Sequence, residues 1–451
     1  MINESLKKTK HYVVIGIGLT GVSCVRLLTK YHYRVSVVDT RQIPKNLVAF
    51  KKEFPHVPIT LGSLVLPQDL DIIVLSPGLD SKIPVLKLAK LQGIPIIGDI
   101  ELFSQHVDAA VVAITGSNGK STVATLFAKL AEACGVSVGL GGNIGVPALS
   151  LLEKKFQLYV LELSSFQLET TYSLEPNIAI ILNVTPDHLD RYENIKQYRL
   201  AKLRIYHLAK SIVYNRGDPH TWPSNNTQKS MISFGLDAPK QNHFGLIQDE
   251  NARNYLAKGK DKLFFTSNLK LLGKQNILNV LASLALIDLM GLSITNCLPI
   301  LESFSALPHR CEILGKFAEV LWINDSKCTN VGAAIAAFEG ISCHISKKII
   351  PILGGDSKGT DLLPLIPYIQ AHSRVVILFG KSKKKFLELL ENKVPCYVVD
   401  TMENAVYLAK SYALSGDAVL LSPACASFDM FKNFQVRGNI FKQAVEELVK
   451  P

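Results

Sequence analysis

The chain has 451 residues, of which 48% are hydrophobic and 19% charged, so it is too long for one ordinary core and too apolar for a disordered protein. The run closest to a membrane span, 280–292, is short and interrupted by Asp288, so no transmembrane helix is expected. The formal net charge of +11 is dispersed apart from Lys381 and Lys383 to Lys385, which fits a solvated surface and does not indicate nucleic acid.

Short β-branched runs alternate with helical stretches from residue 11 onward, which is typical of a parallel sheet flanked by helices. The first run enters the segment 16–21, Gly-Ile-Gly-Leu-Thr-Gly, and Asp39 ends the following run. This GxGxxG spacing is the dinucleotide fingerprint, in which glycines let the backbone approach a pyrophosphate. The motif indicates a diphosphate with a ribose-like group; a tight turn without a ligand is the alternative.

A second series of strands begins near residue 109 and carries a phosphate loop. The loop 115–122 reads TGSNGKST and lies between an apolar strand and a helix. In such a loop backbone N–H groups cradle phosphates, Lys120 neutralises the β and γ oxygens, and the Ser121 hydroxyl can ligate Mg²⁺. Ile114 stands where the general pattern has its first glycine, but the shorter form is still specific. We therefore expect ATP to bind here.

Three further features follow the phosphate loop. Glu162 ends a strand run, where a carboxylate can ligate Mg²⁺; the alternative is a hydrogen-bonded strand residue. The run 183–192, NVTPDHLDRY, places His188 among acidic residues after another strand, which suits metal or phosphate contact. Lys202, taken by itself, is most simply a cation on a helix face.

The rest of the chain divides into an irregular segment, a helix and a third α/β series. Segment 215–270 is rich in Asn, Lys and Asp and suggests antiparallel strands, and 271–291 predicts an amphipathic or buried helix. Strand-like runs resume after Leu307 and Pro308. The α/β prediction is three consecutive domains: a Rossmann-like unit over 1–99, a central P-loop ATPase-type parallel sheet over 100–306, and a C-terminal Rossmann-like unit over 307–451.

Eight cysteines are scattered along the chain without CxxC pairing. Scattered thiols fit a reducing compartment better than a disulfide framework or a zinc site. We therefore expect a cytoplasmic protein, and we expect it to act as a monomer.

Several long motifs resemble those of the Mur ligases, in the same order. They are TGSNGKST, LELSSFQLE, NVTPDHLDRY, YRLAKLRIY, LPHRCE, WINDSKCTN, LGGDSKGTD and SPACASFDMFKNFQVRG, and the resemblance covers essentially the whole chain. The last three resemble the D-glutamate-adding branch, and the Asp-Asn-Pro-Arg run of the diaminopimelate-adding branch is not found here. The resemblance implies UDP-binding, ATPase and amino-acid-binding domains, in that order.

The reaction implied by the resemblance is ATP-dependent amide formation between D-glutamate and UDP-N-acetylmuramoyl-L-alanine, in peptidoglycan precursor synthesis. It would pass through an acyl phosphate and release ADP and phosphate. Two Mg²⁺ ions are implied, one near Ser121 and Glu162, the other near His188 and Lys202. In the family the lysine matching Lys202 is carbamylated, which turns a cation into a metal ligand; desolvation and a nearby metal favour this. Catalytic roles are implied for Lys120, Glu162, His188 and Lys202.

The resemblance also implies binding residues in each domain. UDP-substrate contacts are Leu19, Thr20, Asp39, Arg41, Ser76, Pro77, Gly78, Asn143 and His188. ATP contacts are Gly116, Ser117, Asn118, Gly119, Lys120, Ser121, Thr122, Asn276, Asn279, His309, Arg310 and Asp325. D-glutamate contacts are Lys327, Thr329, Lys358, Ser427 and Phe434. Gln275 and Cys311 depart from the family, where His and Phe are common, and leave the adenine-side details open.

Three other functions are alternatives. An NAD-dependent dehydrogenase would use the first glycine loop but leaves the second unexplained. A nucleotide switch or UDP-binding regulator would use nucleotides without catalysis. A folate polyglutamate ligase shares the chemistry but should lack residues 1–99 as a UDP domain.

Overall fold

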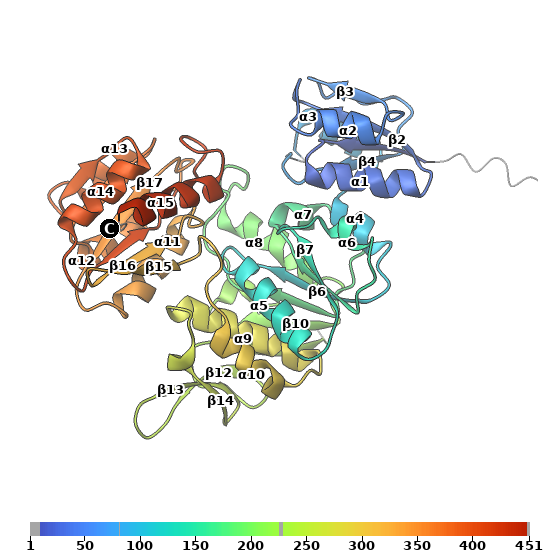
Figure 1. Cartoon of the computed structure of the whole chain (residues 1–451). Coiled ribbons are helices and arrows are strands. Elements are labelled where there is room, and N and C mark those ends of the chain that lie inside the picture. The colour runs from blue at the N-terminus through green and yellow to red at the C-terminus, as the bar shows by residue number, and fades with distance from the viewer. Residues whose placement is uncertain (1–9, 81, 225–228, 449–451) are drawn as a thin grey trace, which may run out of the picture.

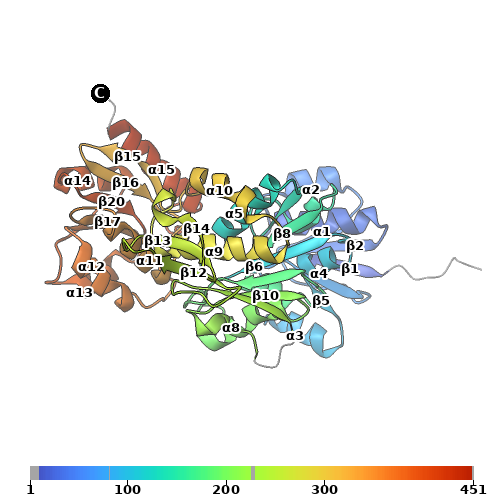
Figure 2. The same ribbon diagram turned by 90° about the horizontal axis from the view of Figure 1, so that it is seen from below.

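The computed structural model describes residues 10–80, 82–224 and 229–448. Three sheets follow one another along the chain, and the domain built on the second lies between the other two (Figures 1 and 2). This is the three-domain α/β architecture predicted from the sequence. The exact ends of the domains stay predictions, and the outer ends of the first and third lie outside the described residues.

The N-terminal domain is a parallel sheet in the order β3-β2-β1-β4-β5. Its central strand is buried on both faces, as is usual in parallel sheets: Val14 packs with residues of α1, and Ile15 packs with residues of α3. The elements are β1 (His11–Ile15), α1 (Leu19–Lys30), β2 (Arg34–Asp39), α2 (Leu47–Glu53), β3 (Ile59–Leu61), β4 (Ile72–Leu75), α3 (Pro84–Leu91) and β5 (Ile96–Ile97).

The central domain has a nine-stranded sheet in the order β14-β13-β12-β11-β10-β9-β6-β8-β7. Strands β12 to β14 pair antiparallel, which confirms that part of the prediction for 215–270, whereas β11 pairs parallel with β10. The helix predicted over 271–291 is α9, in which residues 279–287 are all buried because the helix packs against α5, α10 and the sheet.

The helices and strands of this domain alternate up to β10. They are α4 (Asp99–Ser104), β6 (Ala110–Thr115), α5 (Lys120–Ala133), β7 (Val138–Gly142), α6 (Ala148–Leu151), β8 (Leu158–Glu162), α7 (Ser165–Glu169), β9 (Ile178–Ile181), α8 (Ile195–Leu203), β10 (Ser211–Asn215), β11 (Ser230–Phe234), β12 (Phe244–Gln248), β13 (Asn254–Lys258), β14 (Asp261–Phe265), α9 (Lys274–Leu289) and α10 (Ile294–Ser303).

The C-terminal domain is a sheet in the order β15-β16-β20-β17-β18-β19, in which only β15 is antiparallel to its neighbour. The elements are β15 (Glu312–Phe317), β16 (Val320–Asn324), α11 (Val331–Ser342), β17 (Ile349–Gly354), α12 (Ile366–His372), β18 (Val376–Phe379), α13 (Lys383–Leu390), β19 (Cys396–Val398), α14 (Met402–Tyr412), β20 (Ala418–Leu421) and α15 (Phe434–Leu448).

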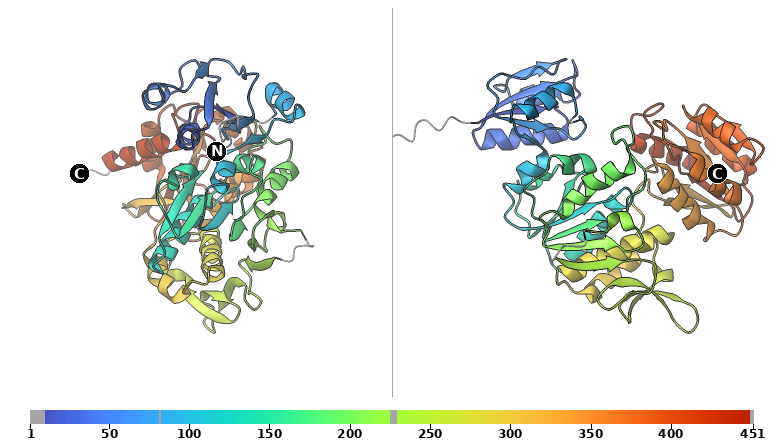
Figure 3. Two further views of the ribbon diagram at one scale, coloured as in Figure 1. Left: turned by 90° about the vertical axis from the view of Figure 1, so that its right-hand side faces the viewer. Right: turned by 180° about the vertical axis from the view of Figure 1, so that it is seen from behind.

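The outer domains contact the central one differently; both lie along its upper side in Figure 3 (right), the N-terminal domain to the left and the C-terminal domain to the right. Helix α1 of the N-terminal domain packs on α4 and α6, and one apolar cluster runs through this contact. The C-terminal domain touches the central domain through α11 on α9 and through polar side chains around the loop after β6. Among the described helices, none is both long and apolar enough to cross a bilayer.

Candidate active site

The phosphate loop joins β6 to α5 and is closed on itself by hydrogen bonds. Lys120 Nζ donates to the carbonyl oxygens of Gly116 and Ser117 at 2.8 and 2.9 Å. Gly119 has a φ of 84°, and a Cβ there would lie 2.5 Å from Asn279 Oδ1, so only glycine fits. Helix α5 starts without a side-chain cap, which leaves its first N–H groups for an anion.

Ser121 and Glu162 form an oxygen-rich pair beside this loop. The Ser121 hydroxyl donates to Glu162 Oε2 at 2.5 Å and accepts from Arg310 Nη2 at 2.6 Å. Asn143 Nδ2 donates to the other Glu162 oxygen at 2.9 Å. Hydroxyl and carboxylate oxygens are the ligands that Mg²⁺ prefers, so this pair fits an ion that also contacts phosphate. No group of three or more His, Cys, Asp or Glu suited to a metal occurs among the described residues.

Lys202 is not a surface cation, because α8 carries it beneath the phosphate loop with 1% exposure. Its Nζ donates to Gly116 O at 2.9 Å and lies 4.5 Å from the centre of the Tyr198 ring. Burial, and then the charge of Lys120, lowers the pKa of Lys202 well below its usual value. Because both lysines donate to the same carbonyl, the neutral amine of Lys202 is favoured, and this is the form that reacts with CO₂.

His188 follows β9 in the left-handed region, with a φ of 54°. Its ring meets Phe166 edge-on at 4.9 Å, and its Nε2 lies 3.8 Å from Asp187 Oδ2. Burial lowers the pKa of His188, against the opposing charge of Asp187, so the ring is neutral near pH 7 and can act as a metal ligand. The ammonium of Lys202 cannot ligate a metal, so Lys202 could contribute to a second ion here only as the carbamate.

One cavity of about 460 Å³ brings residues of the central and C-terminal domains together. Most predicted site residues outside the N-terminal domain line it: Ser117, Asn118, Gly119, Lys120, Ser121, Asn143, Glu162, His188, Lys202, Arg310, Lys327, Thr329, Lys358, Ser427 and Phe434.

The C-terminal wall of this cavity carries two lysines. Lys327 Nζ lies 4.3 Å from the centre of the Phe434 ring, and burial, followed by the charge of Arg310, lowers the pKa of Lys327 to about 8. Lys358 has a φ of 48° and its Nζ lies 5.7 Å from the centre of the exposed Phe428 ring. Two cations on one wall suit a ligand with two carboxylates.

A smaller cavity of about 160 Å³ adjoins the first and is partly apolar. Its lining includes the predicted residues Thr122, Asn276, Asn279, Arg310 and Asp325, and the two departures Gln275 and Cys311.

Two predicted nucleotide contacts, Asp325 and His309, have side-chain hydrogen bonds within the C-terminal domain itself. The Asp325 carboxylate accepts from Ser422 Oγ at 2.8 Å and from Cys311 N at 3.1 Å, and burial raises the pKa of Asp325 to about 7. His309 is buried, with Nδ1 3.0 Å from Asn324 Nδ2. Their contact with a nucleotide stays a prediction.

The predicted residues of the N-terminal domain lie apart from the cavity, at the ends of β1, β2 and β4. Asp39 accepts from Ile17 N at 2.9 Å and from Arg41 at 2.8 and 2.7 Å. Burial raises the pKa of Asp39, but these donors outweigh it and lower the pKa to about 2. Asp39 therefore holds the glycine loop in shape. Of the others, Ser76 donates to Gly16 O, Leu19 and Thr20 begin α1 with Leu19 69% exposed, and Gly78 lies in the turn after β4.

Arg191 connects this domain to the loop of His188 and was not predicted. Its Nη1 donates to Pro77 O at 3.2 Å, its Nη2 donates to Glu169 at 2.7 Å, and its guanidinium stacks 4.0 Å from the centre of the Phe166 ring. Asn330 was also missed, although an Asn directly before an apolar helical run is a cap signal. Nothing in the sequence indicates that Arg191 reaches another domain.

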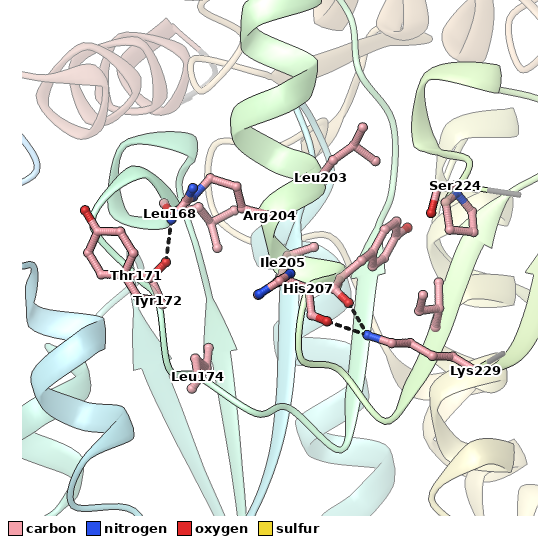
Figure 4. A pocket seen from close by; sticks show the side chains of 13 residues that line it. Leu168, Thr171, Tyr172, Leu174, Leu203, Arg204, Ile205, His207, Ser224 and Lys229 are labelled. Carbon is pink, nitrogen blue, oxygen red and sulfur yellow. Dashed lines mark hydrogen bonds between the residues drawn. The ribbon is translucent and has the colours of Figure 1, made fainter. Parts of the chain in front are cut away.

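A larger cavity of about 660 Å³ lies elsewhere on the central domain, beside α7 and the end of α8 (Figure 4). Its cations serve main-chain oxygens: Arg204 donates to Leu168 O and Thr171 O, and Lys229 donates to Tyr206 O and His207 O. It holds no predicted site residue, so the phosphate-loop cavity is the candidate active site.

Three family models match the chain. They are described as "Mur ligase MurD-like, N-terminal domain" over residues 10–98, "Mur ligase middle domain" over 114–287 and "Mur ligase, glutamate ligase domain" over 309–425.

Curated relatives match over almost the whole chain. A UDP-N-acetylmuramoylalanine–D-glutamate ligase of Legionella pneumophila is 45% identical, covering 97% of this chain and 99% of the relative. The protein of the same name from Pseudomonas aeruginosa is 44% identical, covering 98% and 100%.

Solved structures share the fold at lower identity. The MurC ligase of Thermotoga maritima has a TM-score of 0.61 at 19% identity, covering 97% of this chain and 99% of that one. The MurF ligase of the same organism, solved in complex with ADP, has a TM-score of 0.62 at 17% identity, covering 98% and 100%.

Proposed function

The chain belongs to the Mur ligase family, and on this premise we propose that it joins D-glutamate to UDP-N-acetylmuramoyl-L-alanine at the expense of ATP. The product is a peptidoglycan precursor. The observation that carries the proposal is the single cavity in which the phosphate loop, the Ser121–Glu162 pair and the lysines 327 and 358 meet.

The L-alanine carboxylate needs activation, because an oxide is a poor leaving group. A carboxylate oxygen attacks the γ-phosphorus of ATP, the bond from that phosphorus to the β–γ bridging oxygen breaks, and ADP leaves. The amine of D-glutamate then attacks the acyl carbon and loses a proton. The tetrahedral intermediate expels phosphate and leaves the amide.

The residues of the cavity can serve both steps. Lys120 turns from its loop carbonyls to the γ-phosphate, where it counters the charge of the transferring group. Arg310 lies beside Ser121 and offers a planar fork to phosphate oxygens. Lys327 and Lys358 hold the two carboxylates of D-glutamate, with Thr329, Ser427 and Phe434 around them.

Bound Mg²⁺ neutralises phosphate oxygens; Ser121 and Glu162 would hold one ion, and His188 with carbamylated Lys202 a second. The contacts that the family resemblance implies for UDP, adenine and D-glutamate complete the proposed site. We further propose that the protein is a cytoplasmic monomer that acts on small molecules and does not bind nucleic acid.

The dehydrogenase alternative is disfavoured by the second glycine loop. A nicotinamide dinucleotide would use the loop of residues 16–21 and would leave the loop of Lys120 and the Ser121–Glu162 pair without a role. A thermal shift with UDP-muramoyl-alanine and Mg-ATP, but none with NAD(H), is the expected result.

A substrate panel tests the function directly. The purified chain is offered UDP-muramoyl-alanine, Mg-ATP and one of several amino acids, and product masses and released phosphate are recorded. We expect phosphate release that depends on both acceptors, with D-glutamate incorporated. Incorporation of a different amino acid would overturn the specificity, and phosphate release without either acceptor would favour a nucleotide switch.

A further inference from the structure

Asn330 lies where the C-terminal domain meets the phosphate loop, and its buried carboxamide uses its full hydrogen-bonding capacity. As the N-cap of α11, its Oδ1 accepts from Ala333 N at 2.8 Å, and the same oxygen accepts from Asn118 Nδ2 at 3.5 Å. Its Nδ2 donates to Asn118 Oδ1 and to Asp187 Oδ2, both at 3.1 Å. An amide has two donor hydrogens and two acceptor lone pairs, so none is left for a ligand.

The two partners belong to the two catalytic loops of the central domain. Asn118 immediately precedes the Gly119–Lys120 turn, and its backbone is clamped by Asn183, with hydrogen bonds of 2.8 and 3.0 Å. Asp187 accepts from His188 N at 2.9 Å. One side chain of the C-terminal domain therefore touches both the loop that holds Lys120 and the loop that holds His188.

Arg310 makes a second contact between these domains, but of a different kind. Its partner Ser121 is a proposed metal and phosphate ligand, so this contact changes when the nucleotide binds. Asn330 instead bonds the side chains of Asn118 and Asp187. Asn118 is an expected ATP contact as part of a loop whose backbone N–H groups cradle phosphate, and Asp187 is not assigned to a ligand. Close packing supports the Asn330 contacts: a Cβ on Gly332 would lie 3.1 Å from Thr185 Oγ1.

We infer that Asn330 is a positioning residue that sets the C-terminal domain in register with the two catalytic loops. Its kinetic consequence rests on the proposed function. Lys327 and Thr329 lie in the same segment, so the bonds to Asn118 and Asp187 fix the distance between the amino-acid side of the cavity and the phosphate loop.

Two substitutions separate this role from the helix cap. Serine and aspartate are both good N-caps, so Asn330→Ser and Asn330→Asp keep the bond to Ala333 N and lose the donations to Asn118 and Asp187. Asn330→Asp also sets a carboxylate against Asp187. Thr401→Ser, which exchanges one capping hydroxyl for another at the exposed start of α14, is the matched control.

We expect Asn330→Ser to lower kcat about tenfold to a hundredfold, the loss expected for two such hydrogen bonds, with the Kd for Mg-ATP and the Tm close to those of Thr401→Ser. Asn330→Asp should lose more. X-ray scattering with a non-hydrolysable ATP analogue should show wild type more compact than Asn330→Ser.

Wild-type kcat and compaction in Asn330→Ser would overturn the inference. So would a fall in the Tm of Asn330→Ser that accounts for its lower kcat, because the substitution would then act by destabilising the domain and not by displacing it. If the wild type itself forms no amide, the proposed function fails, and the scattering comparison still decides the role of Asn330.

Discussion

At the scale of single residues, the site buries ionisable side chains in surroundings that disfavour their charged forms. Lys120 and Lys202 donate to the same Gly116 carbonyl, and burial lowers the pKa of each. Two ammonium groups that share one acceptor repel each other, and the more enclosed Lys202 gives up its proton more readily. The environment therefore favours the uncharged amine that the proposed carbamate requires.

Replacing Lys202 by alanine tests the carbamate. We expect Lys202→Ala to lose about a hundredfold to a thousandfold in kcat, the usual effect of removing one preorganised charge-stabilising group. A short carboxylic acid should restore part of the activity, because it can occupy the position of the carbamate. Rates with and without acetate or formate are the measurement. A fully active variant would exclude the carbamate, and Lys210→Ala, an exposed lysine after α8, serves as the control.

Asp99, at the junction of the first two domains, makes stability depend on pH. Its Oδ2 accepts from Gln167, its Oδ1 has no hydrogen-bond partner among the described residues, and burial raises its pKa to about 6. The folded state thus holds the proton more tightly than the unfolded state. The stabilisation is complete below about pH 4 and is lost as the pH rises to about 6, a difference of about 3 kcal/mol.

We therefore expect Asp99→Asn to be more stable than the wild type above about pH 6, since its amide needs no proton. The difference in free energy of unfolding between variant and wild type, from urea titrations, should grow between about pH 4 and 6 and then stay constant. The exposed Asp108→Asn should show no such growth. A constant difference for Asp99→Asn over the whole range would contradict the assignment.

At the scale of elements, α11 crosses α9 where glycines face each other. Gly273 precedes α9 with a φ of 87°, and Gly340 lies inside α11; a Cβ on Gly340 would be 3.0 Å from the Gly273 Cα. The crossing brings apolar residues of α11, such as Ala336, next to Asn276 in the small cavity. The distance between α11 and α9 at this crossing therefore sets the width of the proposed adenine site.

Alanine at Gly340 tests this crossing. In an ordinary helix interior the change would stabilise by about 1 kcal/mol. Here the new Cβ pushes α11 from α9, so we expect a lower Tm and a raised KM for ATP with D-glutamate affinity little changed. Glu339→Ala, at the exposed neighbouring position, should leave both unchanged. A higher Tm with normal KM for Gly340→Ala would show that the helices adjust freely.

The sequence indicates clearly the helices and strands with strong apolar runs, and it gives little signal for short strands at the edges of the sheets. The runs at β1, β6 and β9 are strongly apolar, and α9 is buried on every side, so periodicity and β-branching identify them. Strands β3, β7 and β15 lack such a signal, since each lies at a sheet edge and is short, glycine-rich or half-exposed. Lys202 was recognised through its resemblance to the family, because periodicity does not reveal a buried lysine.

At the scale of the whole molecule, the placement of the domains could not be predicted. It depends on contacts between residues far apart in sequence, such as Arg310 with Ser121 and Asn330 with Asn118. Each contact is made by an ordinary polar residue, and no rule of sequence spacing predicts which residue it will meet. The structure places all four predicted catalytic residues in one cavity but leaves the predicted UDP contacts Leu19, Thr20 and Arg41 outside it. The UDP side must therefore be reached by a long substrate, by domain movement, or by both.

Scattering tests the movement. We expect the radius of gyration to fall when UDP-muramoyl-alanine and an ATP analogue are added together, because ligands shared between domains stabilise the closed arrangement and exclude water from the acyl phosphate. Each ligand added alone is the control and should have a smaller effect. Superimposable profiles with and without both ligands would exclude a large closure.

The bond from Arg191 to the N-terminal domain ends on the main-chain oxygen of Pro77. Every amino acid has such an oxygen, so this hydrogen bond does not depend on which side chain occupies position 77. Substitutions in this loop can therefore change the proposed UDP-substrate contacts while the hydrogen bond from Arg191 remains, provided that the backbone keeps its path. Evolution can thus vary the side chains of the loop after β4 while the contact between the first two domains is kept.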